Sequence, residues 1–145
     1  MGRVLGIDFG DKWIGLALSD PSRTFARPLR VVDASSDLQG LLTKLIQSEG
    51  IDYIVLGLPL NMDGSMGPKA RQVLHFRERM EKESGLMVET WDERLTTVQA
   101  DQALRLTGLS SRKRAEQVDK VAAQILLQSY LDCQKRIQDE RKTTS

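Results

Sequence analysis

Apolar residues near the start of the chain come in short runs, and turn-forming residues bound each run. The runs over residues 3–9 and 13–19 are too short for helices, and a glycine-containing turn separates them. They therefore predict a β-hairpin. A third strand is predicted over residues 25–32, where Pro28 favours a sheet edge or a bulge because proline donates no hydrogen bond to a neighbouring strand.

Farther along the chain, helical and strand-like apolar spacing alternate. Residues 36–49 carry leucine and isoleucine three and four positions apart, and Gly50 is expected to end this helix. Residues 51–58 form an apolar run typical of a buried strand. A loop then leads to Pro68, which suits the first turn of a helix that ends near Glu83.

The last third of the chain predicts one more strand and two helices. The strand covers residues 86–91. A Thr-x-x-Gln capping box opens a helix over residues 96–108, where a glycine ends it. The last helix begins after a serine cap, Ser110 or Ser111, and is expected to end near Arg136.

The predicted order is three strands, then helix, strand, helix, strand and two helices. Three antiparallel strands followed by strand–helix units give an α/β fold, a mixed five-stranded sheet with helices on both faces. This is the ribonuclease H-like arrangement. We expect one such domain over residues 1–136 and a flexible tail over residues 137–145. Sites in sheets of this kind form at the carboxyl ends of the parallel strands.

The charge and the small numbers of cysteine and histidine residues exclude several classes of function. The net charge is +1, so affinity for a nucleic acid has to come from local basic clusters. One cysteine, Cys133, excludes an internal disulfide and a cysteine-based zinc site. One histidine, His75, argues against a histidine-rich metal site or a Ser-His-Asp triad, and we expect it on a helix surface. We find no membrane-spanning segment and no signal peptide, so we expect a cytoplasmic protein with no membrane partner.

Two aspartates interrupt surfaces that the pattern assigns to the interior. Asp8 ends the first strand on the same face as Val4 and Gly6, and Asp119 interrupts an apolar stripe of the last helix. A buried carboxylate is costly unless it is paired, protonated or bound to a cation, so a shared metal site is an economical explanation. Alternatively, Asp8 braces the hairpin turn, or Asp119 pairs with Arg112.

A third carboxylate is expected where the strand over residues 86–91 ends. Glu93 is the first candidate and Asp92 is its competitor. Three converging carboxylates suit one or two Mg²⁺ or Mn²⁺ ions, which prefer oxygen ligands. Two ions about 4 Å apart can activate water and stabilise the leaving oxygen in phosphodiester hydrolysis. Alternatively, either residue stabilises the next helix, because a negative charge near a helix N-terminus interacts favourably with the helix dipole.

The segment over residues 57–71 predicts a phosphate site. Its glycines permit unusual backbone angles, and the helix that begins near Pro68 directs its backbone N–H groups at the same crevice. Alternatively, this segment is a surface loop without a ligand, and the basic residues near it only form a solvent-exposed face. The phosphate- or nucleic-acid-binding candidates, from this segment and from the basic positions that flank the acidic site, are Lys12, Asn61, Gly64, Lys69, Arg71, Arg94, Arg112, Lys113 and Arg114.

Four segments resemble, in order and spacing, the YqgF (RuvX) family: GIDFGDKWIGLALSD, IVLGLPLNMDGSMGPKA, WDERLTT and DKVAAQILLQSYL. The resemblance extends over about residues 3–131. It implies a ribonuclease H-like nuclease that depends on Mg²⁺ or Mn²⁺, with catalytic and metal-binding roles for Asp8, Glu93 and Asp119. Better-known resolvases carry a carboxylate at the end of the fourth strand, where this chain has Gly-Leu-Pro over residues 57–59. The third ligand is therefore expected from the end of the following strand.

The leading hypothesis is a metal-dependent endonuclease, a hydrolase acting on ester bonds in structured RNA. The resemblance implies 5′-end maturation of precursor 16S ribosomal RNA, a step of ribosome biogenesis. A Holliday junction resolvase acting on branched DNA is the first alternative and should be a two-fold dimer, whereas the RNA nuclease can be a monomer or a homodimer. Alternatives of other classes are a nucleic-acid-binding protein with a vestigial site and an actin-like nucleotide binder.

Overall fold

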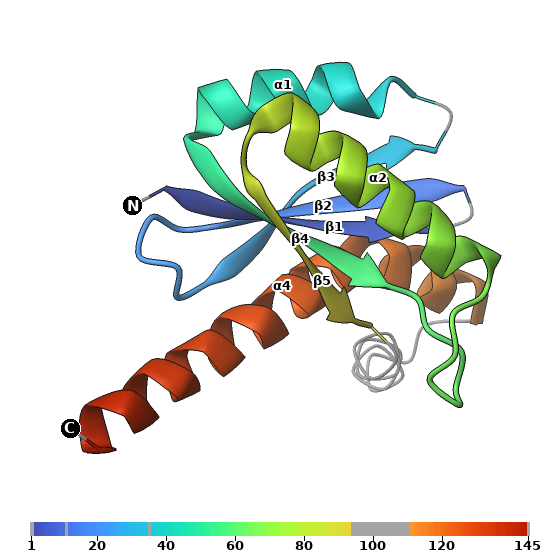
Figure 1. Ribbon diagram of the computed structural model, residues 1–145. Helices are drawn as coiled ribbons and strands as arrows, with labels where there is room; N and C mark the ends of the chain where they lie inside the picture. The colour runs from blue at the N-terminus through green and yellow to red at the C-terminus, as the bar shows by residue number, and fades with distance from the viewer. Residues whose placement is uncertain (1, 11, 35, 94–110, 145) are drawn as a thin grey trace.

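The computed structural model describes residues 2–10, 12–34, 36–93 and 111–144, with the backbone alone for 111–120 and 143–144. It contains a five-stranded sheet of strand order β3-β2-β1-β4-β5 (Figure 1). The strands are β1 (Arg3–Phe9), β2 (Trp13–Ser19), β3 (Ala26–Asp33), β4 (Ile51–Leu58) and β5 (Met87–Asp92). The helices of the described residues are α1 (Leu38–Glu49), α2 (Pro68–Ser84) and α4 (Ser111–Thr144). The helix predicted over residues 96–108 lies outside the described residues.

The strand directions confirm the predicted mixed sheet. β1 pairs antiparallel with β2, and β2 pairs antiparallel with β3. β4 lies between β1 and β5 and is parallel to both. Because parallel strands end at the same edge of a sheet, Asp8, Gly57 and Asp92 come to lie along one carboxyl edge. Each strand begins and ends within one residue of its predicted bounds.

β3 is an edge strand and accommodates Pro28 in the way that the sequence predicts. Its pairing with β2 shifts register, since Leu16 pairs with Arg30 and Ala17 pairs with Pro28. Leu29 is the extra residue of this bulge. The missing N–H of Pro28 therefore falls where the regular ladder is interrupted and lies on an edge strand.

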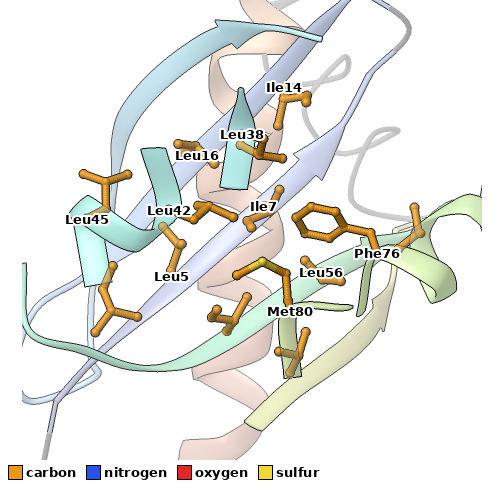
Figure 2. Close-up of a cluster of buried hydrophobic side chains, with 14 of the residues drawn as sticks. Leu5, Ile7, Ile14, Leu16, Leu38, Leu42, Leu45, Leu56, Phe76 and Met80 are labelled. Atoms are coloured by element: carbon orange, nitrogen blue, oxygen red, sulfur yellow. The ribbon is translucent and has the colours of Figure 1, made fainter. Parts of the chain in front are cut away.

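α1 and α2 cover one face of the sheet and enclose the larger apolar core (Figure 2). From β1, Leu5 and Ile7 point into this core and are fully buried, as is Leu42 of α1. Phe76 of α2 packs edge-on against Phe9, with ring centroids 5.0 Å apart. Because Leu5, Ile7 and Phe9 all point to this face, period-two alternation directs Asp8 to the other face.

α4 packs against the other face, where small residues let it approach the strands (Figure 1). A Cβ on Gly6 would lie 2.9 Å from Leu127 Cβ and 3.5 Å from the carbonyl oxygen of Ala123. Ala17, which pairs with Gly6 across β1 and β2, is fully buried in the same cluster. This confirms the predicted close approach of a helix to the small residues of β1 and β2.

Most helix boundaries agree with the prediction. Asp37 caps α1 by accepting a hydrogen bond from the N–H of Gly40 (3.1 Å), and Gly50 ends the helix in a left-handed conformation with φ 65°. α2 begins at Pro68, and α4 begins at Ser111, both as predicted. Local capping signals are thus sufficient to set these helix ends.

The prediction that the last helix ends near Arg136 is wrong. α4 continues to Thr144, so residues 137–144 are helical. The apolar periodicity that predicts a packed helix stops there. However, Gln, Glu, Arg and Lys form helices readily, and the basic Arg141 and Lys142 suit the negative end of the helix dipole. None of the described helices is both long and apolar enough to cross a membrane.

Replacing Gly6 by alanine is expected to lower the free energy of unfolding by about 1–3 kcal/mol, because the added methyl group would force α4 away from β1. Urea unfolding followed by circular dichroism measures this loss. Lys44→Ala, at an exposed position of α1, is the control and should change the free energy by no more than about 0.5 kcal/mol. Equal stability of Gly6→Ala and the unaltered protein would contradict the close packing.

Candidate active site at the carboxyl edge of the sheet

Two carboxylates, from β1 and from the end of β5, converge over Gly57. A Cβ on Gly57 would overlap Glu93 Oε2 and would lie 3.4 Å from Asp8 Oδ1. Gly57 belongs to β4, the strand that separates β1 from β5. The missing side chain of Gly57 therefore leaves the space that the Glu93 carboxylate fills beside Asp8.

Strand pairing holds the backbone at both acidic positions. Asp8 pairs with Gly15 across β1 and β2. Glu93 directly follows β5, and its N–H donates a hydrogen bond to the carbonyl oxygen of Leu58 in β4 (3.3 Å). The two carboxylates are thus carried by the rigid sheet, which fixes their separation better than a mobile loop would.

The alternation of β5 separates Glu93 from its competitor Asp92. Trp91 packs against the cluster under α4, and Val88 belongs to the core under α1 and α2. Because successive strand residues point to opposite faces, Glu93 lies on the same face as Trp91, and Asp92 lies on the opposite face. Asp92 is exposed. Of the two acids, Glu93 is the one that lies beside Asp8.

Burial and charge together raise the pKa of Glu93 to about 9. Removal of the carboxyl from water is the largest cause, followed by the hydrogen bond with Asp8 and the negative charge of Asp8. The positive charge of Lys69 opposes this rise, and the charge of Asp92 adds slightly to it. Glu93 Oε2 is also buried without a hydrogen-bond partner among the described residues. The carboxyl of Glu93 therefore needs a proton or a cation at neutral pH.

Asp119 lies in α4, and its side chain is outside the described residues. Its position follows from the direction of the helix, because α4 runs antiparallel to β1 (Figure 1). Gln128 of α4 accepts a hydrogen bond from the N–H of Ala26, which pairs with Ser19 near the amino end of β1. Leu126 instead lies against Gly57 at the carboxyl edge. Earlier residues of α4 therefore lie nearer the acidic pair.

Ala123, Leu126 and Tyr130 of α4 are buried against the sheet. That Asp119 shares this side stays a prediction from helical spacing. Among the residues with described side chains, no group of three or more His, Cys, Asp or Glu surrounds a possible metal ion. The side chains of Asp119 and of Arg112, its alternative partner, lie outside the described residues. Asp119 as a third carboxylate beside Asp8 and Glu93 therefore stays a prediction from the sequence.

The loop between β4 and α2 is held together by its own hydrogen bonds. Asn61 Nδ2 donates to Ser65 Oγ (3.0 Å), and the N–H of Gly64 donates to the carbonyl oxygen of Asn61 (2.8 Å). Gly64 has a φ of 88°, a left-handed conformation that favours glycine. The Asn61 side chain therefore has a structural partner, and the loop presents a defined backbone at the start of α2.

The predicted basic residues fall into two groups. Lys12, Lys69 and Arg71 are exposed, and Lys69 lies close enough to Glu93 to act on its pKa. Arg94 and the side chains of Arg112, Lys113 and Arg114 lie outside the described residues. His75 is exposed on α2, as predicted. Within the described part of the chain, Lys69 is thus the basic side chain that the structure brings to the acidic pair.

The mixed sheet, with α1 and α2 on one face and α4 on the other, is a ribonuclease H-like fold, which confirms the predicted fold class. The fold and the pair of acidic residues at its carboxyl edge, Asp8 and Glu93, place the protein among α/β proteins with a ribonuclease H-like fold. The chain belongs to the RuvX family, whose model, described as Holliday junction resolvase, matches residues 2–133. The family predicted from the four sequence segments is confirmed.

Two relatives cover nearly the whole chain. The protein from Caldanaerobacter subterraneus subsp. tengcongensis is 42% identical over 136 residues, which are 92% of this chain and 98% of the relative. The protein from Thermoanaerobacter pseudethanolicus is 40% identical over 136 residues, with the same coverage. Both carry the name "Putative pre-16S rRNA nuclease".

Two solved structures that share this fold are complexes with Holliday junctions. RuvC from T. thermophilus, in complex with a Holliday junction substrate, aligns with a TM-score of 0.51 at 16% identity, covering 87% of this chain and 92% of that one. The fowlpox virus resolvase, in complex with Holliday junction DNA, aligns with a TM-score of 0.52 at 12% identity, covering 90% and 97%. At these identities the likeness concerns the fold.

Glu93→Gln is expected to stabilise the metal-free protein, and more so at pH 8 than at pH 5. With a folded-state pKa of about 9 and an ordinary value of 4.5, Glu93 keeps its proton in the folded protein and loses it on unfolding. The stability that the protonated carboxyl contributes is fully present below pH 4.5 and is lost as the pH rises towards 9. The contribution of glutamine to stability does not change with pH, because its side chain does not titrate.

Thermal unfolding in EDTA at several pH values measures this difference. A gain in the unfolding temperature that grows with pH, reaching several degrees at pH 8, supports the raised pKa. Glu83→Gln, at an exposed position of α2, is the control and should leave the pH profile unchanged. A constant difference between Glu93→Gln and the unaltered protein from pH 5 to pH 8 would show that Glu93 is ionised throughout.

Proposed function

We propose that this chain is a hydrolase, an endonuclease that cuts phosphodiester bonds in structured RNA. The role that we assign to it is 5′-end maturation of precursor 16S ribosomal RNA, which implies a cytoplasmic protein. The shared name of the relatives, at 40–42% identity over 136 residues, supports this substrate. The observation that carries the chemistry is the convergence of the Asp8 and Glu93 carboxylates over Gly57.

Asp8, Glu93 and Asp119 would hold one or two Mg²⁺ or Mn²⁺ ions. Carboxylate oxygens are the ligands that these ions prefer. Glu93 Oε2, which has no hydrogen-bond partner among the described residues, suits such a role. When bound there, such ions would supply a lowered pKa for the attacking water and compensation for the charge on the leaving oxygen. The residues of the chain bind and orient the phosphodiester group, and burial of the Glu93 carboxyl strengthens its attraction to a cation.

Basic residues at the same edge would bind the phosphates of the substrate. Lys69 acts electrostatically on Glu93, so it is suited to a phosphate next to the cleaved bond. Lys12 and Arg71, both exposed, would bind more distant phosphates. We assign the same role to Arg94, Arg112, Lys113 and Arg114. With a net charge of +1, these local contacts must supply most of the electrostatic affinity.

A Holliday junction resolvase is the second candidate, and the description of the matching family favours it. A resolvase makes two symmetric cuts, so it requires a two-fold dimer with one acidic site in each subunit. The RNA nuclease requires one site and is compatible with either a monomer or a homodimer. The relatives' name favours the RNA substrate, which is why the resolvase stands second.

Asp8→Asn and Asp119→Asn are each expected to lower Mg²⁺-dependent cleavage of a precursor 16S RNA fragment at least about 100-fold, because each removes a proposed metal ligand. Circular dichroism checks that the variants fold. Asp92→Asn is the matched control, since Asp92 is exposed on the opposite face, and it should retain most of the activity. Undiminished cleavage by folded Asp8→Asn would refute the proposed site.

The unaltered protein is expected to cut the precursor RNA and to leave a four-way DNA junction uncut under the same conditions. Gel electrophoresis of end-labelled substrates measures both reactions. Size-exclusion chromatography with light scattering provides the oligomeric state. Paired symmetric cuts in the junction by a dimer, without cleavage of the RNA, would favour the resolvase over the RNA nuclease.

A further inference from the structure

A pocket of about 560 Å³ lies between α1 and α2, on the face of the sheet opposite α4. Typical ligand sites measure roughly 300–1,000 Å³, so the volume is sufficient for a nucleotide-sized group. Val73 and Phe76, both largely buried, form part of its apolar wall together with Phe9. Lys69 and Arg79, both exposed, add two positive charges.

The pocket adjoins the acidic site at the end of β1. Asp8 faces α4, whereas its neighbour Phe9 lines the pocket, because successive strand residues point to opposite faces. Lys69 lines the pocket as well, and its charge acts on Glu93. A nucleic-acid strand with one phosphate at the carboxylates would therefore reach the pocket by crossing the sheet edge beside Lys69.

The pocket carries the side-chain groups that recognise nucleobases. Arg79 places its guanidinium carbon 5.9 Å from the centroid of the Phe76 ring. Gln39 lines the wall, and its Nε2 is buried without a hydrogen-bond partner among the described residues. Gln72 supplies a second amide from an exposed position. Proteins bind unpaired bases by stacking on aromatic and guanidinium groups and by hydrogen bonds from amides.

We propose that this pocket holds one unpaired nucleobase of the strand that is cut, next to the cleaved phosphodiester bond. The inference rests on the proposed nuclease function and adds a substrate requirement to it. The one acid in the pocket wall, Asp37, accepts a hydrogen bond from Gly40 as the cap of α1, while Lys69 and Arg79 attract the sugar–phosphate backbone. The preferred substrate thus has an unpaired nucleotide next to the cleaved bond.

Binding in EDTA tests the pocket independently of cleavage. The probe is a short single-stranded oligoribonucleotide with one 2-aminopurine, whose fluorescence reports base stacking. Gln72→Trp, which fills the pocket, and Arg79→Ala are each expected to weaken binding at least about 5-fold, as expected for loss of one stacked base. Lys82→Ala, at an exposed position of α2 outside the pocket, is the control and should bind like the unaltered protein.

Abasic nucleotides identify the base that enters the pocket. Each position on either side of the cleaved bond of the precursor RNA is replaced in turn by an abasic residue. We expect a single position at which the loss of the base slows cleavage by the unaltered protein at least about 5-fold. The same abasic substitution should have no further effect on Gln72→Trp, because that variant no longer admits the base. Circular dichroism confirms that the variants fold.

The outcomes separate this inference from the nuclease function. Normal cleavage with equal sensitivity of the unaltered protein and Gln72→Trp to every abasic position would overturn the base pocket and leave the nuclease intact. Absence of RNA cleavage, together with pocket-dependent binding of the oligoribonucleotide in EDTA, would overturn the nuclease function and keep the pocket as a base-binding site. Tight binding by Gln72→Trp and Arg79→Ala in EDTA would also reject the pocket.

Discussion

The proximity of the Asp8 and Glu93 carboxylates is the constraint on which the rest of the site depends. Two acids side by side, one of them buried, are unfavourable unless a proton or a cation compensates their charge. The raised pKa of Glu93 reflects this cost, and so does its Oε2, which is buried with no hydrogen-bond partner in the described part of the chain. Gly57 makes the arrangement sterically possible, since any side chain there would occupy the space of the Glu93 carboxylate.

The sheet topology explains how distant parts of the chain contribute to one edge. β1, β4 and β5 are parallel and adjacent, so their carboxyl ends lie together although they are separated by long stretches of sequence. α4 crosses the other way on small residues such as Gly6, which directs its N-terminal turns to the same edge. The face opposite α4 supplies Lys69 and the pocket between α1 and α2. One edge therefore combines acidic groups on one face with basic and aromatic groups on the other.

Much of this arrangement could be predicted from the sequence, because strands and caps are encoded locally. Asp8 was identifiable as a polar residue on an apolar face. The choice between Asp92 and Glu93 was not decidable, since a shift of one residue in the pairing register of β5 exchanges the two faces. The pocket could not be predicted, because it depends on the distance between α1 and α2. The helical extension after Arg136 has no apolar stripe to reveal it.

The length of α4 has a practical consequence. At about 1.5 Å per residue, the turns from Ala123 to Thr144 extend about 30 Å, and the helix projects well past the strands on the side away from the carboxyl edge (Figure 1). A fluorophore or an affinity tag attached to this projecting end would lie far from the Asp8 and Glu93 carboxylates. The protein can therefore be tethered to a surface there without obstructing access to the acidic pair at the carboxyl edge.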